Sequence, residues 1–150
     1  MALRNDITIG GGPSYRLGVK EEFSAMGINI ESYYYFVNEF RVGLDLHYYL
    51  VDWDFSPRAW EANINTGILV LEDRDLYVFG LLGIQFLWVE YDWGEAFGKD
   101  KHYGFGFNIG GSVEYDIDFL RFYAEPKITL YTVNKFRFTP NLAIGIRYFF

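Results

Sequence analysis

Apolar and polar residues alternate along most of the chain with a period of two. The clearest example is the run over residues 40–51. Its apolar positions are Phe40, Val42, Leu44, Leu46 and Tyr48, and its polar or small positions are Arg41, Gly43, Asp45 and His47. Successive side chains of a β-strand point to opposite faces. The pattern therefore predicts a strand with one apolar and one polar face.

The same alternation predicts eight strands, near residues 3–12, 23–35, 40–51, 61–71, 76–91, 102–116, 120–132 and 138–150. The connections after the second, fourth and sixth strands are short. Longer connections are predicted at residues 13–22, 52–60 and 92–101, and a short one around 133–135. Short turns at one end and long loops at the other are typical of up-and-down membrane barrels. We therefore expect an all-β, eight-stranded antiparallel barrel that occupies residues 1–150 as a single domain.

Glycine indicates which face lines the barrel. Nine glycines share the parity of the charged and amide residues: Gly10, Gly27, Gly43, Gly67, Gly83, Gly104, Gly106, Gly110 and Gly145. Only Gly80 and Gly111 fall plainly on the apolar parity. The interior of an eight-stranded barrel is so narrow that side chains fill it, and small residues prevent collisions there. We predict a polar lumen and an apolar exterior that faces lipid.

Aromatic residues make up 21% of the chain, more than a small core requires. On the turn side they are Tyr33, Tyr34, Phe36, Phe40, Tyr77, Tyr115, Phe119, Phe122, Tyr148 and Phe150. On the loop side they are Tyr15, Tyr48, Tyr49, Trp53, Trp60, Trp88, Tyr91, Trp93, Tyr103 and Tyr131. Aromatic rings favour the headgroup level of a membrane. The two groups are therefore interpreted as interfacial girdles, although aromatic residues are also good strand formers.

The chain ends in an alternating strand in which Gly145, Tyr148 and Phe150 match the terminal assembly signal of outer-membrane barrels. Ala143 stands where that signal usually has a polar residue. Over its full length the chain resembles the small eight-stranded barrels of the OmpA/OmpX type. The resemblance implies a location in the bacterial outer membrane, a monomer surrounded by membrane lipids, and insertion by the barrel-assembly machinery. The alternative fold is a soluble lipocalin-like carrier, which would need the apolar parity inside.

The predicted lumen contains many ionisable side chains: Asp6, Glu31, Arg41, Asp45, His47, Glu61, Glu114, Arg121, Glu125, Lys127 and Arg147. A charge buried alone is very costly, so these groups must pair with one another or be hydrated. We predict an internal polar network that fills the barrel. A narrow or gated pore is the alternative.

Catalytic and metal chemistry have little support in the sequence. The chain has no cysteine, and His47 lies near Asp45 without a third ligand at a diagnostic spacing. A simple nucleophile–base pair would favour a serine close to a histidine, but no serine lies within a few residues of one. We expect no enzyme, metal or cofactor, with a lipid-modifying enzyme as the rival hypothesis. The net charge of −7 also argues against nucleic-acid binding.

Function is therefore expected in the long loops, where a rigid scaffold usually carries recognition. Trp53, Trp60 and Trp93 stand among carboxylates there and are candidates for binding a protein or glycan. They could equally be membrane anchors. The predicted role is structural, adhesive or accessory. Pro126 is expected to mark a bulge or a barrel rim, because proline removes a ladder hydrogen bond.

Overall fold

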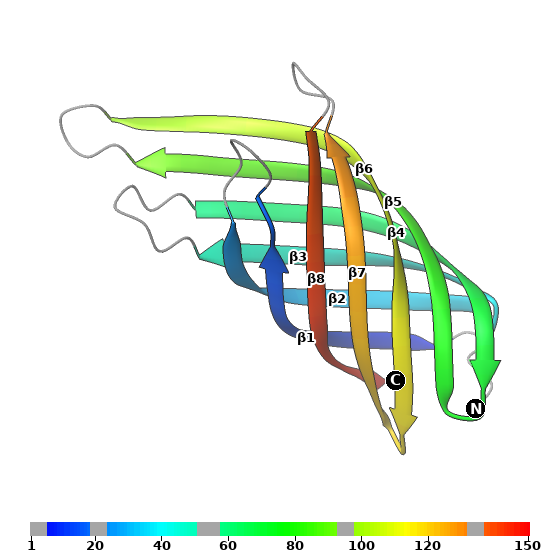
Figure 1. Cartoon of the computed structure of the whole chain (residues 1–150). Helices are drawn as coiled ribbons and strands as arrows, with labels where there is room; N and C mark the ends of the chain where they lie inside the picture. The colour runs from blue at the N-terminus through cyan, green and yellow to red at the C-terminus, as the bar shows by residue number, and fades with distance from the viewer. Residues whose placement is uncertain (1–5, 19–23, 51–57, 93–97, 132–136) are drawn as a thin grey trace.

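The protein forms a closed barrel of eight antiparallel strands (Figure 1). This computed structural model describes residues 6–18, 24–50, 58–92, 98–131 and 137–150. The strands are β1 (Ile7–Arg16), β2 (Ala25–Val37), β3 (Phe40–Leu50), β4 (Arg58–Asp73), β5 (Leu76–Asp92), β6 (Lys99–Ile117), β7 (Leu120–Tyr131) and β8 (Arg137–Phe149). Each strand pairs with the next, and β1 pairs with β8. The predicted architecture is confirmed. The described residues contain no helix that could cross a membrane.

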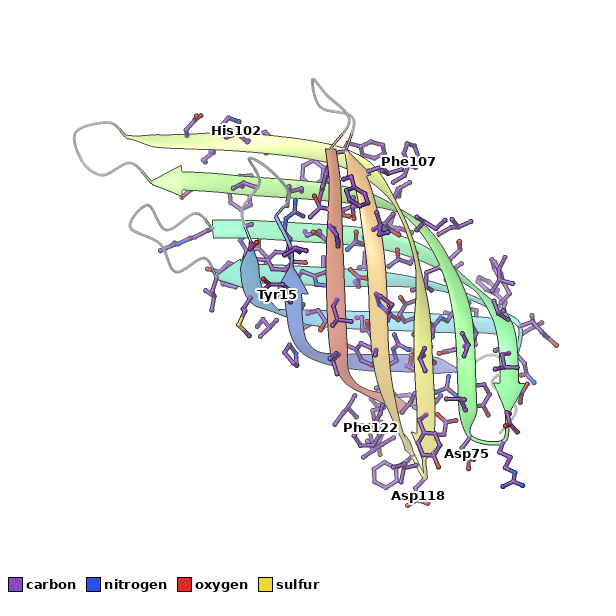
Figure 2. The ribbon with its side chains drawn as sticks, in the orientation of Figure 1. Tyr15, Asp75, His102, Phe107, Asp118 and Phe122 are labelled. Atoms are coloured by element: carbon purple, nitrogen blue, oxygen red, sulfur yellow. The ribbon has the colours of Figure 1, made fainter. Side chains whose placement is uncertain are left out.

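The apolar parity faces outward and the polar parity faces the lumen. Leu44 is 48% exposed on the outer surface, whereas the next residue, Asp45, is fully buried. Phe107 and Asn108 show the same contrast, at 54% and 3%. Figure 2 shows Phe107 and Phe122 among the side chains that project from the barrel wall. The predicted sidedness is confirmed, and the soluble carrier with an apolar lining is contradicted.

Several aromatic rings nevertheless lie inside the barrel. Four tyrosines that were assigned to the girdles are buried in the lumen: Tyr33, Tyr49, Tyr77 and Tyr131. Tyr49 is the register partner of Gly27 across the β2–β3 ladder, and a Cβ on Gly27 would lie 2.9 Å from Tyr49 Cδ1. The ring thus uses the space that a missing side chain leaves. The sequence interpretation was wrong for these four residues, and for Tyr33, Tyr49 and Tyr131 a cross-strand glycine makes room for the ring.

The inward rings form two apolar clusters at opposite ends of the lumen. At the loop end the cluster consists of Ala25, Tyr49, Ala59, Leu87, Val89 and Tyr131. At the turn end it consists of Tyr33, Tyr35, Tyr77, Phe79 and Leu81. These contacts explain why β5 is apolar on both faces, since it supplies inward residues to both clusters. The charged part of the lumen lies between the two clusters.

Two of the three prolines within the described strands, Pro13 and Pro126, differ from expectation. Strand β1 does not end at Gly12 but continues through Pro13 to Arg16. Pro126 lies within β7 as the register partner of Leu142, without a shift in that ladder. The β6–β7 pairing is interrupted beside it but resumes in the same register, so the predicted bulge at Pro126 is wrong. Register shifts occur instead at Tyr35/Val37 and at Leu69/Leu71.

The two ends of the barrel differ in how the strands are connected and in how far the strands extend. At one end, tight turns join β2–β3, β4–β5 and β6–β7, and the backbone N–H of Phe150 donates to Ile7 O (2.9 Å). We call this the turn end, and the opposite end the loop end. At the loop end, β5 and β6 form the longest hairpin, which extends beyond the neighbouring strands (Figure 1). Strands β4 to β6 therefore include residues 58–60, 92 and 99–101 of the predicted loops 52–60 and 92–101.

Candidate functional site

Inward positions of six strands bring the predicted polar residues together in one buried network. The ten residues concerned are Glu31, Arg41, Asp45, His47, Glu61, Glu114, Arg121, Glu125, Lys127 and Arg147, and none is more than 3% exposed. Asp6 is only half-buried. Arg16 joins the network although the sequence interpretation missed it. It lies on the lumen parity of β1, beyond the point where that strand was predicted to end.

Glu114 on β6 is the centre of the network at the turn end. Arg41 Nη1 and Arg147 Nη1 both donate to its Oε1, and Arg121 Nη1 donates to its Oε2 at 2.8 Å. Ser112 Oγ adds a hydrogen bond to Oε1 at 2.6 Å. Three guanidinium groups from β3, β7 and β8 thus share one carboxylate, which ties distant parts of the barrel wall together across the lumen.

Arg147 extends this centre to two further carboxylates. Its Nε donates to Glu31 Oε1 and its Nη2 donates to Glu125 Oε1. Arg41 Nη2 lies 3.4 Å from the same Glu125 oxygen. The planar guanidinium has donors in fixed directions, so one arginine can bridge three acids in a way that lysine cannot. The predicted network is therefore present, with Arg147 as its main bridge.

Asp45 forms a second centre, nearer the loop end. It accepts hydrogen bonds from Lys127 Nζ, Asn63 Nδ2 and Asn65 Nδ2. His47 Nε2 lies 2.9 Å from Asp45 Oδ1, but neither imidazole nitrogen makes a well-aligned hydrogen bond within the described part of the chain. The His47 ring instead stacks on Tyr49 with centroids 5.7 Å apart. The predicted luminal histidine is thus a packed member of the network.

Arg16 and Glu61 link this centre to the apolar cluster at the loop end. Arg16 Nη1 donates to Glu61 Oε2 at 3.1 Å and to Tyr131 Oη at 2.7 Å. Asn141 Nδ2 donates to the other Glu61 oxygen at 3.2 Å. Both Arg16 and Glu61 are buried, so their pairing removes the cost of two isolated charges.

Five acidic and five basic side chains balance in the lumen. The acids are Glu31, Asp45, Glu61, Glu114 and Glu125, and the bases are Arg16, Arg41, Arg121, Lys127 and Arg147. Glu31, Asp45 and Glu125 approach within 4.8 Å, as metal ligands would. However, Arg147 and Lys127 already bind these carboxylates. The geometry is that of internal ion pairs which fill the lumen and hold the wall together.

The β5–β6 hairpin is the most prominent feature at the loop end. Strand β6 pairs with β7 only from Gly106 onward, so residues 99–105 have no β7 partner among the described residues. His102 lies on this extension, far from Asp75 and Asp118 at the turns (Figure 2). His102 Nε2 lies 3.0 Å from Asp100 Oδ2, and both side chains are exposed. This part of β6 therefore extends beyond the described part of β7 and presents exposed polar side chains.

The structure describes only one of the three tryptophans that were predicted as recognition residues in the loops. Trp53 and Trp93 lie outside the described residues. Trp60 was predicted in a loop but lies in β4, where it is exposed on the outer wall. Its centroid is 4.4 Å from that of Tyr48 on β3. Trp60 is thus placed as a membrane-interface residue would be, and the loop assignment was wrong because β4 begins at Arg58.

The three residues of the predicted assembly signal do not lie on the same face of the barrel wall. Gly145 faces the lumen, where a Cβ would lie 2.6 Å from Tyr123 Oη. Tyr148 and Phe150 are exposed on the outside, with ring centroids 5.1 Å apart. Their role in assembly remains a prediction.

Two of the four serine hydroxyls that the structure describes take part in a hydrogen bond. Ser112 Oγ donates to Glu114, and Ser24 Oγ accepts the backbone N–H of Gly18 at 2.9 Å. Ser14 Oγ is buried without a hydrogen-bond partner among the described residues. Neither of the two contacts involves a histidine.

No protein-family model and no curated protein matches the chain. Solved structures do. Neisserial surface protein A is 14% identical, with a TM-score of 0.77 and 97% of each chain covered. The N-terminal barrel domain of Pseudomonas aeruginosa OprF is 12% identical, with a TM-score of 0.72 and full coverage of both chains. Yersinia pestis Ail, in complex with the heparin analogue sucrose octasulfate, is 13% identical, with a TM-score of 0.70 and coverage of 98% and 99%. The chain therefore has the fold of the small eight-stranded outer-membrane β-barrels.

Proposed function

We propose that this protein is a non-enzymatic barrel of the bacterial outer membrane that acts as an adhesive or accessory binding protein. The observation that carries the proposal is the contrast between its two regions. The lumen is filled by neutralised ion pairs between two apolar clusters, whereas the β5–β6 hairpin extends beyond the neighbouring strands at the loop end (Figure 1). The proposal favours recognition at the loop end over transport through the lumen or catalysis.

A rigid scaffold usually carries recognition in the segments that project from it. The part of the β5–β6 hairpin beyond the register partners Glu90 and Lys101 is the proposed recognition element. A protein or glycan of the environment is the proposed ligand. Likeness to Ail, whose structure holds a heparin analogue, makes a sulfated glycan a suitable first probe. The barrel would act as a monomer within membrane lipids, inserted by the barrel-assembly machinery.

A shortened hairpin tests this role directly. Glu90 and Lys101 are register partners, so Asn-Gly can replace residues 91–100 and close the hairpin as a two-residue turn. Bacteria that display either form are compared for adherence to heparin-coated and protein-coated surfaces. We expect adherence by the full-length form and its loss in the shortened one. Equal adherence of both forms, or none by either, contradicts the proposal.

Heat-dependent gel mobility controls for folding of the shortened form, because a folded membrane barrel and its unfolded chain migrate differently. The rival enzyme hypothesis is tested on the same cells. A change in lipid A or phospholipid that depends on the displayed barrel, and disappears in His102→Ala or His47→Ala, would support the enzyme instead.

A further inference from the structure

Two rows of side chains cross the outer surface of β3 to β6 near the loop end. The row nearer the membrane centre is aromatic and consists of the successive register partners Tyr48, Trp60, Trp88 and Tyr103. The next row toward the loops consists of the partners Leu50, Arg58, Glu90 and Lys101. Both rows lie on the outward parity of their strands. We call them the aromatic row and the charged row.

The aromatic row places the charged row at headgroup level. Trp60 and Tyr103 are exposed on the outer surface, and amphipathic rings prefer the interface of a membrane. On the membrane side of this row lie the apolar partners Leu46, Ala62, Phe86 and Phe105. An acyl chain can therefore contact the wall directly below the aromatic row, while a headgroup contacts the charged row.

Among the described side chains, positive charge on the outer surface is concentrated in the charged row. Five of the eight arginine and lysine side chains that the structure describes lie in the lumen, and only Arg58, Arg74 and Lys101 are exposed. Arg58 and Lys101 flank Glu90 on neighbouring strands, about 10 Å apart at a strand spacing of ~4.8 Å. Arg74 lies at the opposite end, in the turn between β4 and β5. Two of the three exposed cations thus share one short row.

Lys101 is only loosely held by its acidic neighbour. Its Nζ is 3.8 Å from Glu90 Oε2, beyond hydrogen-bonding distance, and its side chain is 51% exposed. The ammonium lies 5.8 Å from the ring centroid of Trp88. Trp88 Nε1 is buried and has no hydrogen-bond acceptor among the described residues. A ligand with several acceptor oxygens would satisfy both donors if Lys101 turned toward it.

We propose that the charged row binds the phosphate of a phosphorylated glycolipid in the outer leaflet, between Arg58 and Lys101. The acyl chains lie against the apolar residues below the aromatic row. Glu90 reduces the net charge of the row to +1, which suits a single phosphate group better than a polysulfated chain. The proposal rests on the outer-membrane location proposed above, but not on recognition by the end of the β5–β6 hairpin.

The test uses the purified barrel in phosphatidylcholine nanodiscs that contain either diphosphoryl lipid A or its dephosphorylated form. Native mass spectrometry counts the lipid molecules that stay bound. Charge-assisted contacts lead us to expect roughly tenfold stronger retention of the phosphorylated form. Equal retention of the two lipids by the wild-type barrel overturns the proposal, and this comparison needs no variant.

Variants locate the binding site. The double variant Arg58→Gln with Lys101→Gln is expected to retain both lipids equally, whereas Arg74→Gln removes one exposed cation at the other end and should behave as wild type. Trp88→Phe keeps the ring but loses the N–H, so its retention should fall about two- to threefold. An unchanged double variant, or an equal loss in Arg74→Gln, overturns the assignment. Preferential binding of soluble sucrose octasulfate by the charged row would also overturn it.

The two proposals fail in different ways. The shortened hairpin keeps Arg58, Glu90 and Lys101, so it should lose adherence but retain the phosphorylated lipid. The double glutamine variant should lose the lipid preference but keep adherence. Loss of both properties in either variant, with the barrel still folded, contradicts the separation of the two surfaces.

Discussion

Tyr33 lies directly across the β2–β3 ladder from Gly43, and its ring occupies the space that a side chain at position 43 would need. The Arg41 guanidinium lies over the Tyr33 ring, with its Cζ atom 4.1 Å from the ring centroid. The glycine is therefore required by its partner and not by its own backbone conformation. The same relationship joins Tyr123 to Gly145.

Filling position 43 should therefore destabilise the barrel by overpacking. We expect Gly43→Leu to lower the free energy of unfolding by about 1–3 kcal/mol, as extra volume in a packed interior generally does. Adding Tyr33→Ala should recover much of the loss, because it empties the same space. Urea unfolding in detergent micelles measures both. Additive effects of the two substitutions would show that they do not share a space.

The neighbouring residue tests sidedness. Leu44 faces lipid on the opposite side of the same strand. An arginine there must enter the hydrocarbon region, which costs about 2–4 kcal/mol near the bilayer centre. Leu44→Arg should reduce folding into phosphatidylcholine vesicles, while Leu44→Val should have little effect. Gly43→Arg should also fail, but through overfilling, so Tyr33→Ala should improve folding of that variant and not of Leu44→Arg.

Alternation of residue type predicts the strands because each strand residue has only two directions available, and the parity of the glycines adds the sidedness. That is why Asp45, Glu114 and Arg147 were correctly placed in the lumen. Their partners were not predictable. Arg147 on β8 reaches Glu31 on β2 and Glu114 on β6, and these contacts depend on barrel closure and on rotamers rather than on spacing.

Inward aromatics were missed for a related reason. Tyr33 and Tyr49 differ from true girdle residues only in strand parity, and neighbouring tyrosines at 34 and 48 face outward. The girdle prediction grouped the aromatic residues by strand end and did not separate them by parity, although parity can be read from the sequence. The cross-strand glycine opposite each ring was the signal that could have corrected it. The end of β1 was missed because Pro13 was taken as a loop signal, although proline is compatible with extended backbone.

Removal of the central carboxylate should destabilise the network strongly. Glu114 accepts from Arg41, Arg121 and Arg147, so Glu114→Gln leaves three buried guanidinium groups short of one negative charge. Loss of one partner from a buried ion pair typically costs about 3–5 kcal/mol. Urea titration in micelles should show this loss, whereas Glu39→Gln at the exposed turn should unfold like wild type. A Glu114→Gln barrel of wild-type stability would mean that the network is hydrated.

The filled lumen also predicts electrical behaviour. Ion pairs and the two apolar clusters occupy the space between the barrel ends, so the folded protein should not conduct a steady current. Planar bilayers with single inserted barrels provide the measurement. Phe79→Ala combined with Tyr35→Ala should allow more frequent brief openings, because both residues belong to the apolar cluster at the turn end. Stable open channels in the wild type would instead favour the pore hypothesis.

The terminal aromatic residue offers a way to separate assembly from stability. Phe150 is 72% exposed and its side chain contacts Tyr148 on the outer surface, so it contributes little to the lumen. Phe150→Ala should therefore refold in detergent with nearly wild-type stability, since surface substitutions usually change it by less than about 0.5 kcal/mol. In cells, the same variant should reach the outer membrane several-fold more slowly if the barrel-assembly machinery reads this residue. Phe119→Ala removes another exposed ring at the turn end, which contacts Tyr148 from the other side, and serves as the matched control. A defect of equal size in both variants would assign Phe150 to membrane anchoring, and a refolding defect confined to Phe150→Ala would assign it to the stability of the closed barrel.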